Sequence, residues 1–201
     1  MPQRLKTGPK HVAQTRITAG EWRGRVVSTP PGLEVRPTRA MVRQSLFDIL
    51  GPRVVGARMI DLYAGAGTVG FEALSRGAAT VTFVERHREA LALIAATAER
   101  FHCRDRCTLV GADVPRWLRG AATQTADATL CYVDAPYQDP ELDRVLQLLG
   151  AAPPGLVVCE HHRAREIPEQ IGNLTRFREA RYGLTTISFL QRNAAPSGGT
   201  A

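Results

Sequence analysis

Three glycines and four acidic residues in this sequence have the types and the spacing to form a ligand site. The glycines make a G-x-G-x-x-G pattern within "MIDLYAGAGTVG", at Gly65, Gly67 and Gly70. Such a turn lets the backbone approach a ligand closely and opens a helix whose first amides are free. The pattern is typical of dinucleotide sites, although the same glycines could simply allow a helix and a strand to pack.

Acidic residues around the turn narrow the choice of ligand. Glu85, twenty residues after Gly65, can hold the hydroxyls of a ribose in NAD or in any adenosine ligand. Asp61, four residues before Gly65, would repel a pyrophosphate but attract a ligand that carries an ammonium group. Asp113 ends the segment "VGAD", where its carboxylate could accept a hydrogen bond from an adenine amine.

The segment "DAPY" follows an apolar run and ends in an aromatic residue. The carboxylate of Asp134 and the backbone carbonyl of Ala135 can accept both N–H bonds of an exocyclic amine. Pro136 stiffens the turn, and Tyr137 can stack on a planar base. The alternative is an ordinary loop with a capping Asp and a surface Tyr.

Alternating elements are expected to position these residues. The expected strands are 58–63, 80–85, 106–113, 127–137 and 155–161, and the expected helices are 67–76, 86–101, 114–120 and 140–150. Strands that alternate with helices predict an α/β fold with a doubly wound, mostly parallel sheet. Two further strands around Gly183 predict an antiparallel hairpin at the C-terminal end. In an open parallel sheet, ligands bind at the carboxyl ends of the strands.

Positive charge is concentrated in the first quarter of the chain. The net charge is +7, and residues 1–53 hold ten Lys or Arg against three acids. Residues 15–30 read as two short strands around "GEWRG", and Thr38 is suited to cap the helix that follows it. The excess favours a polyanion partner, and Arg suits phosphate. The alternative is a solubilising basic tail.

Composition excludes several classes of protein. The four cysteines lack the spacing of a zinc site, and the five histidines share no helix face, so no metal site is expected. Cys131 and Cys159 lie in apolar runs and read as buried thiols, which favours a reducing, cytoplasmic setting. No apolar run is long enough to span a bilayer, and no signal peptide is expected.

Taken together, these motifs carry a family resemblance. The glycine turn, Glu85, Asp113 and "DAPY" resemble the class I S-adenosylmethionine-dependent methyltransferases. The segments "RITAGEWRGR" and "RPTRAMVRQSLFDIL" resemble, more narrowly, a bacterial family of 16S ribosomal RNA guanine-N2 methyltransferases, over roughly residues 15–192. The resemblance implies a seven-stranded, Rossmann-like methyltransferase sheet that follows a small N-terminal β-hairpin.

The resemblance also assigns roles to single residues. It implies that S-adenosylmethionine is held at its methionine end by Asp61 and the Gly65–Gly70 turn, at its ribose by Glu85 and at its adenine by Asp113, with Thr38 closing over it. The residues expected at the amine that is methylated are Asp134, Ala135, Pro136 and Tyr137. The residues expected to contact small-subunit ribosomal RNA are Arg16, Trp22, Arg23, Arg25, Arg36, Arg39 and Arg43.

Two departures from the family pattern stand out. Ala135 replaces the first proline of the usual D-P-P-[YF]; because a backbone carbonyl acts there, activity should survive with a looser loop. Residues 39–44, which follow "RPT", lack an acid that the family usually has in this segment. We expect a basic RNA-binding extension over 1–53, a catalytic domain over 54–192 and a disordered tail over 193–201.

Other functions remain open at this point. An adenine-N6 DNA methyltransferase or a glutamine-N5 protein methyltransferase would use the same tetrad. An NAD(P)-dependent oxidoreductase would explain the glycines and Glu85 but would leave "DAPY" without a role. A non-catalytic RNA-binding module is the third alternative. The expected partner is small-subunit ribosomal RNA, either naked or in an assembling subunit with ribosomal proteins, and the chain is expected to be a monomer that binds no membrane.

Overall fold

The computed structural model describes residues 14–29, 37–136 and 139–194, and for residues 37–39 it describes the backbone only. The predictions for residues 1–13, Arg36, Tyr137 and most of the expected C-terminal tail therefore lie outside the described residues, as do the side chains of Thr38 and Arg39. No helix in the described part is long and apolar enough to cross a membrane.

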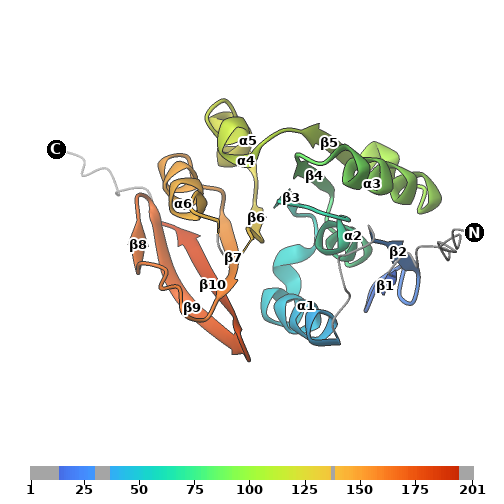
Figure 1. Ribbon diagram of the computed structural model, residues 1–201, viewed down its shortest axis with the longest axis horizontal. Coiled ribbons are helices and arrows are strands. Elements are labelled where there is room, and N and C mark those ends of the chain that lie inside the picture. The colour runs from blue at the N-terminus through green and yellow to red at the C-terminus, as the bar shows by residue number, and fades with distance from the viewer. Residues whose placement is uncertain (1–13, 30–36, 137–138, 195–201) are drawn as a thin grey trace, which may run out of the picture.

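A single large sheet organises the chain (Figure 1). Its eight strands lie in the order β5-β4-β3-β6-β7-β10-β9-β8. Their bounds are β3 Arg58–Leu62, β4 Thr80–Glu85, β5 Cys107–Gly111, β6 Leu130–Val133, β7 Leu156–His162, β8 Gln170–Ile171, β9 Leu174–Tyr182 and β10 Thr185–Arg192. Strands β3 to β7 pair in parallel, whereas β10 pairs antiparallel with β7 and β9.

This topology confirms the predicted α/β fold with its antiparallel C-terminal hairpin. The two-residue strand β8 adds an eighth strand at the edge, beside β9. The helices are α1 Pro37–Leu50, α2 Thr68–Ser75, α3 Arg88–Arg100, α4 Val114–Leu118, α5 Ala122–Asp127 and α6 Leu142–Ala151. Short 3₁₀ turns follow at Gly51–Val54 and Arg104–Arg106.

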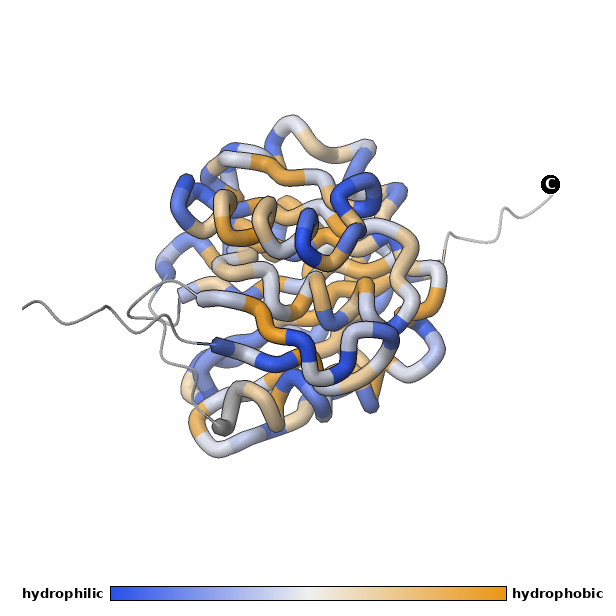
Figure 2. Tube along the Cα trace, turned by 90° about the vertical axis from the view of Figure 1, so that its right-hand side faces the viewer, coloured by the Kyte–Doolittle hydropathy of each residue, from blue (hydrophilic) through white to orange (hydrophobic). Residues whose placement is uncertain are grey.

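The two faces of the sheet are covered by different helices. Side chains alternate along each strand, so Met59 of β3 joins one core cluster and Ile60 the other. Helices α1, α2 and α3 pack in the first cluster, and α4 and α6 pack in the second. Figure 2 shows the apolar segments gathered in the interior of the molecule.

The basic N-terminal segment packs on the first of these faces. Strands β1 Gln14–Arg16 and β2 Val26–Ser28 form an antiparallel hairpin. Ile17, Trp22 and Val27 of this hairpin belong to the same core cluster as Met59. One hydrophobic core thus includes residues from both sides of the predicted division at residue 53.

Candidate functional site

A cavity of about 1000 Å³ opens at the carboxyl ends of the parallel strands. Strand β3 lies between β4 and β6, so the connections that follow it and β6 leave toward opposite sides of the sheet. This is the topological switch point at which open α/β sheets bind ligands. The volume lies at the upper end of the range for small-molecule sites, roughly 300–1,000 Å³, and leaves room for two ligands side by side.

The glycine turn forms one wall of this cavity. Gly65 and Gly67 have φ of +56° and +73°, a left-handed conformation that favours glycine. Gly70 has a different role, because a Cβ atom there would lie 2.3 Å from the ring of Phe83. The structure therefore assigns backbone conformation to the first two glycines and close helix–strand packing to the third.

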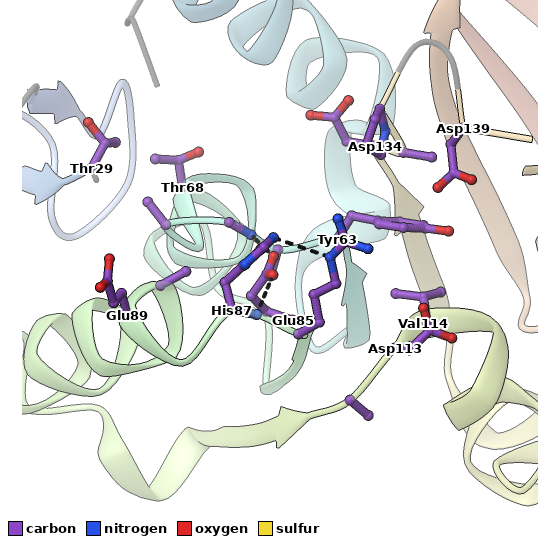
Figure 3. A pocket seen from close by; sticks show the side chains of 18 of the residues that line it. Thr29, Tyr63, Thr68, Glu85, His87, Glu89, Asp113, Val114, Asp134 and Asp139 are labelled. Carbon is purple, nitrogen blue, oxygen red and sulfur yellow. Dashed lines mark hydrogen bonds between the residues drawn. The ribbon is translucent and has the colours of Figure 1, made fainter. Parts of the chain in front are cut away.

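Glu85 projects from the end of β4 into the cavity and is held by two backbone amides (Figure 3). The N–H groups of Gly65 and His87 donate to its two carboxylate oxygens at 2.9 and 2.8 Å. Each carboxylate oxygen can accept more than one hydrogen bond. Glu85 is thus fixed in place with capacity for ligand hydroxyls, as its predicted role at a ribose requires.

Asp113 lies where β5 leads into α4 and also lines the cavity. Its carboxylate caps α4 by accepting from the N–H of Arg116 at 3.1 Å. The side chain therefore has a structural role in addition to the predicted contact with an adenine edge.

Asp61 does not line the cavity, where its predicted role at the methionine end would require it. It lies within β3, inside the expected strand 58–63, and is only 2% exposed. Its carboxylate accepts from the N–H of Gly70 at 3.0 Å. Burial raises the pKa of Asp61 to about 8, against the effect of that hydrogen bond and with a further rise from Glu85. The carboxylate of Asp61 therefore supports the glycine turn from within the sheet.

Replacing Asp61 with asparagine should change how stability depends on pH. The folded pKa of about 8 lies above the unfolded value of about 3.9, so the folded chain keeps a proton that the unfolded chain releases. The stabilisation that this proton gives to the folded state is fully present below the unfolded-state pKa of Asp61. It is lost as the pH rises through the folded-state pKa. The wild type should therefore lose stability relative to Asp61→Asn by up to about 1.4 kcal/mol per pH unit in that window.

Urea denaturation of both proteins across the window measures this difference. Asp105→Asn, at an exposed acid, serves as the control and should show no such trend. A gap between wild type and Asp61→Asn that stays constant with pH would contradict the raised pKa.

Tyr63 was not predicted as a site residue. It lies in the turn with φ of +59°, lines the cavity and sits between the Asp134–Asp139 side and the Asp113–Val114 side (Figure 3). Its hydroxyl oxygen is buried. Burial, followed by the charge of Asp139, raises the pKa of Tyr63. Its one visible signal in the sequence is a polar aromatic residue next to the glycines.

The predicted amine-binding residues follow β6 at the opposite wall. Asp134 is half-buried and lines the cavity, as do the buried Ala135 and the exposed Pro136. The N–H of Asp134 donates to the carbonyl of Leu62 at 3.5 Å. Three of the predicted acids, those of residues 85, 113 and 134, thus meet at one cavity from three different strands.

Two residues predicted to contact RNA are buried. Trp22 is 3% exposed, and its ring lies 5.0 Å from that of Phe101. Arg43 is 6% exposed; its Nε lies 3.3 Å from a carboxylate oxygen of Glu72. Trp22 packs in the core, and Arg43 is held by Glu72 while also lining the cavity. Both side chains therefore have structural roles rather than the predicted position on an exposed RNA-binding surface.

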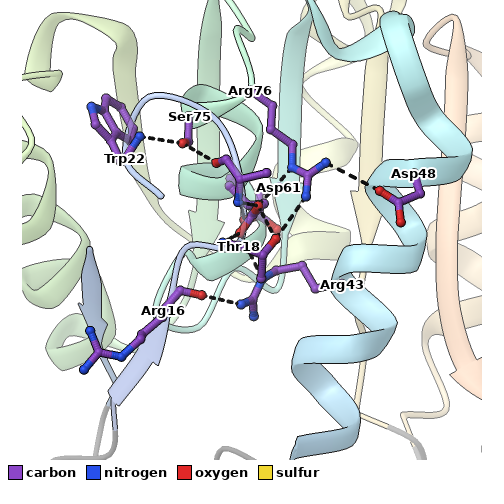
Figure 4. A network of polar contacts seen from close by, with 11 residues as sticks. Arg16, Thr18, Trp22, Arg43, Asp48, Asp61, Ser75 and Arg76 are labelled. Atoms are coloured by element: carbon purple, nitrogen blue, oxygen red, sulfur yellow. Dashed lines mark hydrogen bonds and ion pairs between the residues drawn. The ribbon is translucent and has the colours of Figure 1, made fainter. Parts of the chain in front are cut away.

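Around Glu72 a polar network ties the hairpin to helices α1 and α2 (Figure 4). The hairpin contributes Thr18, whose N–H and hydroxyl donate to Glu72 at 2.9 and 2.6 Å. Ser75 of α2 accepts from the N–H of Trp22 at 2.9 Å. The hairpin is therefore fixed to the helix that begins at the glycine turn.

The remaining predicted RNA contacts lie on the hairpin. Arg16 and Arg23 are exposed, and Arg16 donates to the carbonyl of Gly24 at 3.0 Å. Arg25 is half-buried, with its guanidinium 4.2 Å from the centre of the Phe101 ring. Arg16 and Arg23 are the described members of the predicted set that present charge to solvent.

Within the described part of the chain, no group of three His, Cys, Asp or Glu is arranged to hold a metal ion. Cys103 and Cys107 are buried with their sulfur atoms 4.0 Å apart. Cys131 and Cys159 are buried, as predicted.

Comparison with known sequences gives a consistent match along almost the whole chain. Residues 15–191 match the model of a family described as conserved hypothetical protein 95. A candidate rRNA methyltransferase of Bacillus subtilis, YlbH, is 32% identical over 88% of this chain and 98% of its own length. Ribosomal RNA small subunit methyltransferase D of Escherichia coli is 31% identical over 90% of this chain and 91% of its own length.

Comparison with solved structures agrees with the sheet topology. A candidate methyltransferase of Escherichia coli, yhhF, is 26% identical and superposes with a TM-score of 0.79 over 91% of this chain and 100% of its own. A candidate methyltransferase complexed with SAH, SMU.776, has a TM-score of 0.69 over 94% of this chain and 58% of its own. At 15% identity, the latter shows a shared fold alone.

Proposed function

Because the chain belongs to the family described as conserved hypothetical protein 95 and is similar to the small-subunit ribosomal RNA methyltransferase D of Escherichia coli, we propose that it methylates the exocyclic N2 amine of a guanine in 16S ribosomal RNA. The single observation that carries this proposal is the meeting of Glu85, Asp113 and Asp134 at one cavity. Two of these acids suit an adenosine ligand, and the third suits an amine.

The half of the cavity beside β3, β4 and β5 fits S-adenosylmethionine. Glu85 presents a fixed carboxylate for the ribose, and Asp113 lies at the end of the next strand as an acceptor for the adenine amine. The Gly65–Gly70 turn would hold the methionine end, with Asp61 supporting that turn. When bound, S-adenosylmethionine supplies a methyl group whose bond to the charged sulfur breaks as its bond to the amine nitrogen forms, which leaves S-adenosylhomocysteine.

The other half of the cavity, beside β6, would hold the base. An aromatic amine is a weak nucleophile because its lone pair is delocalised into the ring. Asp134 and the carbonyl of Ala135 would accept its two N–H bonds, which favours a pyramidal nitrogen with its lone pair directed at the methyl group. The extra proton of the methylated amine leaves to solvent. Positioning and fixed dipoles then supply most of the rate enhancement, and the base must be unpaired or flipped out of its helix.

A methyl-transfer assay with isotope-labelled S-adenosylmethionine tests this function. The substrates are small ribosomal subunits from a strain that lacks this protein, their naked RNA, and duplex DNA, with each product digested to nucleosides and identified by mass. Label in N2-methylguanosine supports the proposal. Label in N6-methyladenine from DNA would keep the chemistry and overturn the substrate, and transfer to subunits but not to naked RNA would indicate that ribosomal proteins are required.

Neutralising Arg23 should weaken RNA binding and reduce its dependence on salt. Arg23 is exposed on the hairpin, where we propose that it contacts a phosphate and displaces a counterion. Arg23→Ala should reduce the slope of log affinity against log salt concentration by about 1. Filter binding at several salt concentrations measures the slope. Arg119→Ala removes the same charge from an exposed residue after α4 and should leave the slope unchanged; equal slopes in all three proteins would exclude a phosphate contact at Arg23.

A further inference from the structure

The strand next to β6 is β7, which carries a second carboxylate, Glu160, two residues before its last residue, His162. Strands β6 and β7 are parallel, and Val133 pairs with Cys159. The next residues along the two strands, Asp134 and Glu160, are therefore neighbours across strands that lie about 4.8 Å apart. Because side chains alternate between faces, both carboxylates lie on the face that carries Tyr132. Asp134 lines the cavity, and Glu160 lies next to Asp134 without being one of the lining residues.

A buried tyrosine fixes the position of Glu160. The hydroxyl of Tyr132 donates to Oε2 of Glu160 at 2.6 Å. Tyr132 is 4% exposed, whereas Glu160 is half-buried. Burial, followed by the charge of Glu160, raises the pKa of Tyr132 well above its usual value, so the hydroxyl stays protonated and remains a donor. Two acceptors thus lie on adjacent strands: Asp134 in the cavity wall, and Glu160 next to it, held by the hydrogen bond from Tyr132.

Guanine and adenine present different hydrogen-bonding groups beside their exocyclic amines. In guanine the N2 amine lies next to N1–H, so two donors stand side by side on the same edge. In adenine the N6 amine lies next to an N1 that carries a lone pair. A carboxylate accepts but cannot donate when ionised, so a pair of neighbouring carboxylates complements guanine and repels the N1 of adenine.

We propose that Glu160 determines specificity by accepting a hydrogen bond from N1–H of the target guanine while Asp134 accepts from its N2 amine. This inference rests on the proposed methyl transfer to guanine and adds the residue that selects the base. Tyr132 is a positioning residue, since it acts on the base only through Glu160.

The test compares guanine with 2-aminopurine at the methylated position of a small-subunit RNA. The position is first identified by mass, and the RNA is assembled into subunits where naked RNA is not methylated. 2-Aminopurine keeps the amine at C2 but has a lone pair at N1. The wild type should prefer guanine by about tenfold to hundredfold in kcat/KM, the range expected for a good base contact.

Glu160→Gln should reduce this preference, because an amide can donate to a bare N1 as well as accept from N1–H. We expect the ratio of the two rates to approach unity while affinity for S-adenosylhomocysteine stays unchanged. Tyr132→Phe should reduce the preference partly, since it releases the carboxylate without removing it, and it keeps the proposal testable if Glu160→Gln does not fold. Glu166→Gln, at an exposed acid beyond β7, should retain the wild-type ratio.

A wild-type ratio of the two substrates in folded Glu160→Gln, or in Tyr132→Phe should Glu160→Gln not fold, would overturn the proposal. Failure of the wild type to methylate any guanine in ribosomal RNA would instead overturn the proposed function. The two failures are distinguishable, because the first leaves N2-methylguanosine as the product.

Discussion

Replacement of Asp134 by alanine is expected to reduce the rate of methyl transfer by about 10²–10³-fold, the loss typical when one preorganised group is removed from an active site. The carboxylate lines the cavity at the end of β6, apart from Glu85 and Asp113 on β4 and β5. Affinity for S-adenosylhomocysteine should therefore stay close to that of the wild type. Single-turnover rates with saturating RNA, and calorimetric titration of the cofactor product, measure the two quantities separately.

Two further variants sharpen the result for Asp134. Asp134→Asn keeps an oxygen that can accept one N–H bond, so its rate should lie between those of the wild type and Asp134→Ala. Asp105→Ala removes a carboxylate from an exposed turn and should be fully active. Wild-type turnover by Asp134→Ala would contradict the assignment of this residue, whereas joint loss of rate and cofactor affinity would indicate a general disruption of the cavity.

The fold could be predicted from the sequence wherever the pattern of apolar residues extends over a whole strand or helix. Strands β3 to β7 are apolar runs separated by amphipathic or glycine-led helices, and this alternation allows few topologies. Helix α5, Ala122–Asp127, and strand β8, Gln170–Ile171, were not predicted. Both are short and lack apolar periodicity, so tertiary contacts determine them.

The residues of the site could be predicted from the sequence, but the directions in which their side chains point could not. Glu85, Asp113 and Asp134 follow strands, so the shared edge of a parallel sheet brings them together. Asp61 lies inside the expected strand 58–63, and β3 does include it. The sequence does not show which way a side chain within that strand points, so it could not be predicted that this carboxylate supports the turn instead of lining the cavity.

The sequence itself explains why Arg43 and Trp22 are buried. Arg43 precedes Leu46 and Phe47 by three and four residues, so it shares the apolar face of α1. A two-stranded hairpin is marginally stable by itself, so β1 and β2 require an anchor, and Trp22 provides it. The charge of Arg43 and the aromatic ring of Trp22 suggested RNA contacts, but both side chains are instead buried by packing.

Replacement of Glu72 by alanine is expected to destabilise the protein by about 3–5 kcal/mol, the cost of removing one partner from a buried ion pair. Glu72 is fully buried, and its carboxylate also accepts from Arg76 Nε at 2.9 Å and from the N–H of Ala19 at 3.0 Å. Burial alone would raise the pKa of Glu72, but the hydrogen bonds from Thr18 and Arg76 and the charge of Arg43 lower it below its usual value. The ionised form is therefore the one that the network holds.

The loss should extend from stability to RNA binding, because Glu72 joins the hairpin to α1 and α2. Urea denaturation measures the first effect, and filter binding under folding conditions measures the second. Asp48→Ala is the matched control: Asp48 is 63% exposed and lies 3.9 Å from Arg76, so its loss should cost about 0–1 kcal/mol. In Glu72→Ala, a further change of Arg43 to Leu removes the unpaired buried charge and should restore part of the stability. If the double variant were less stable than Glu72→Ala, Glu72 would not be stabilising the fold by balancing the charge of Arg43.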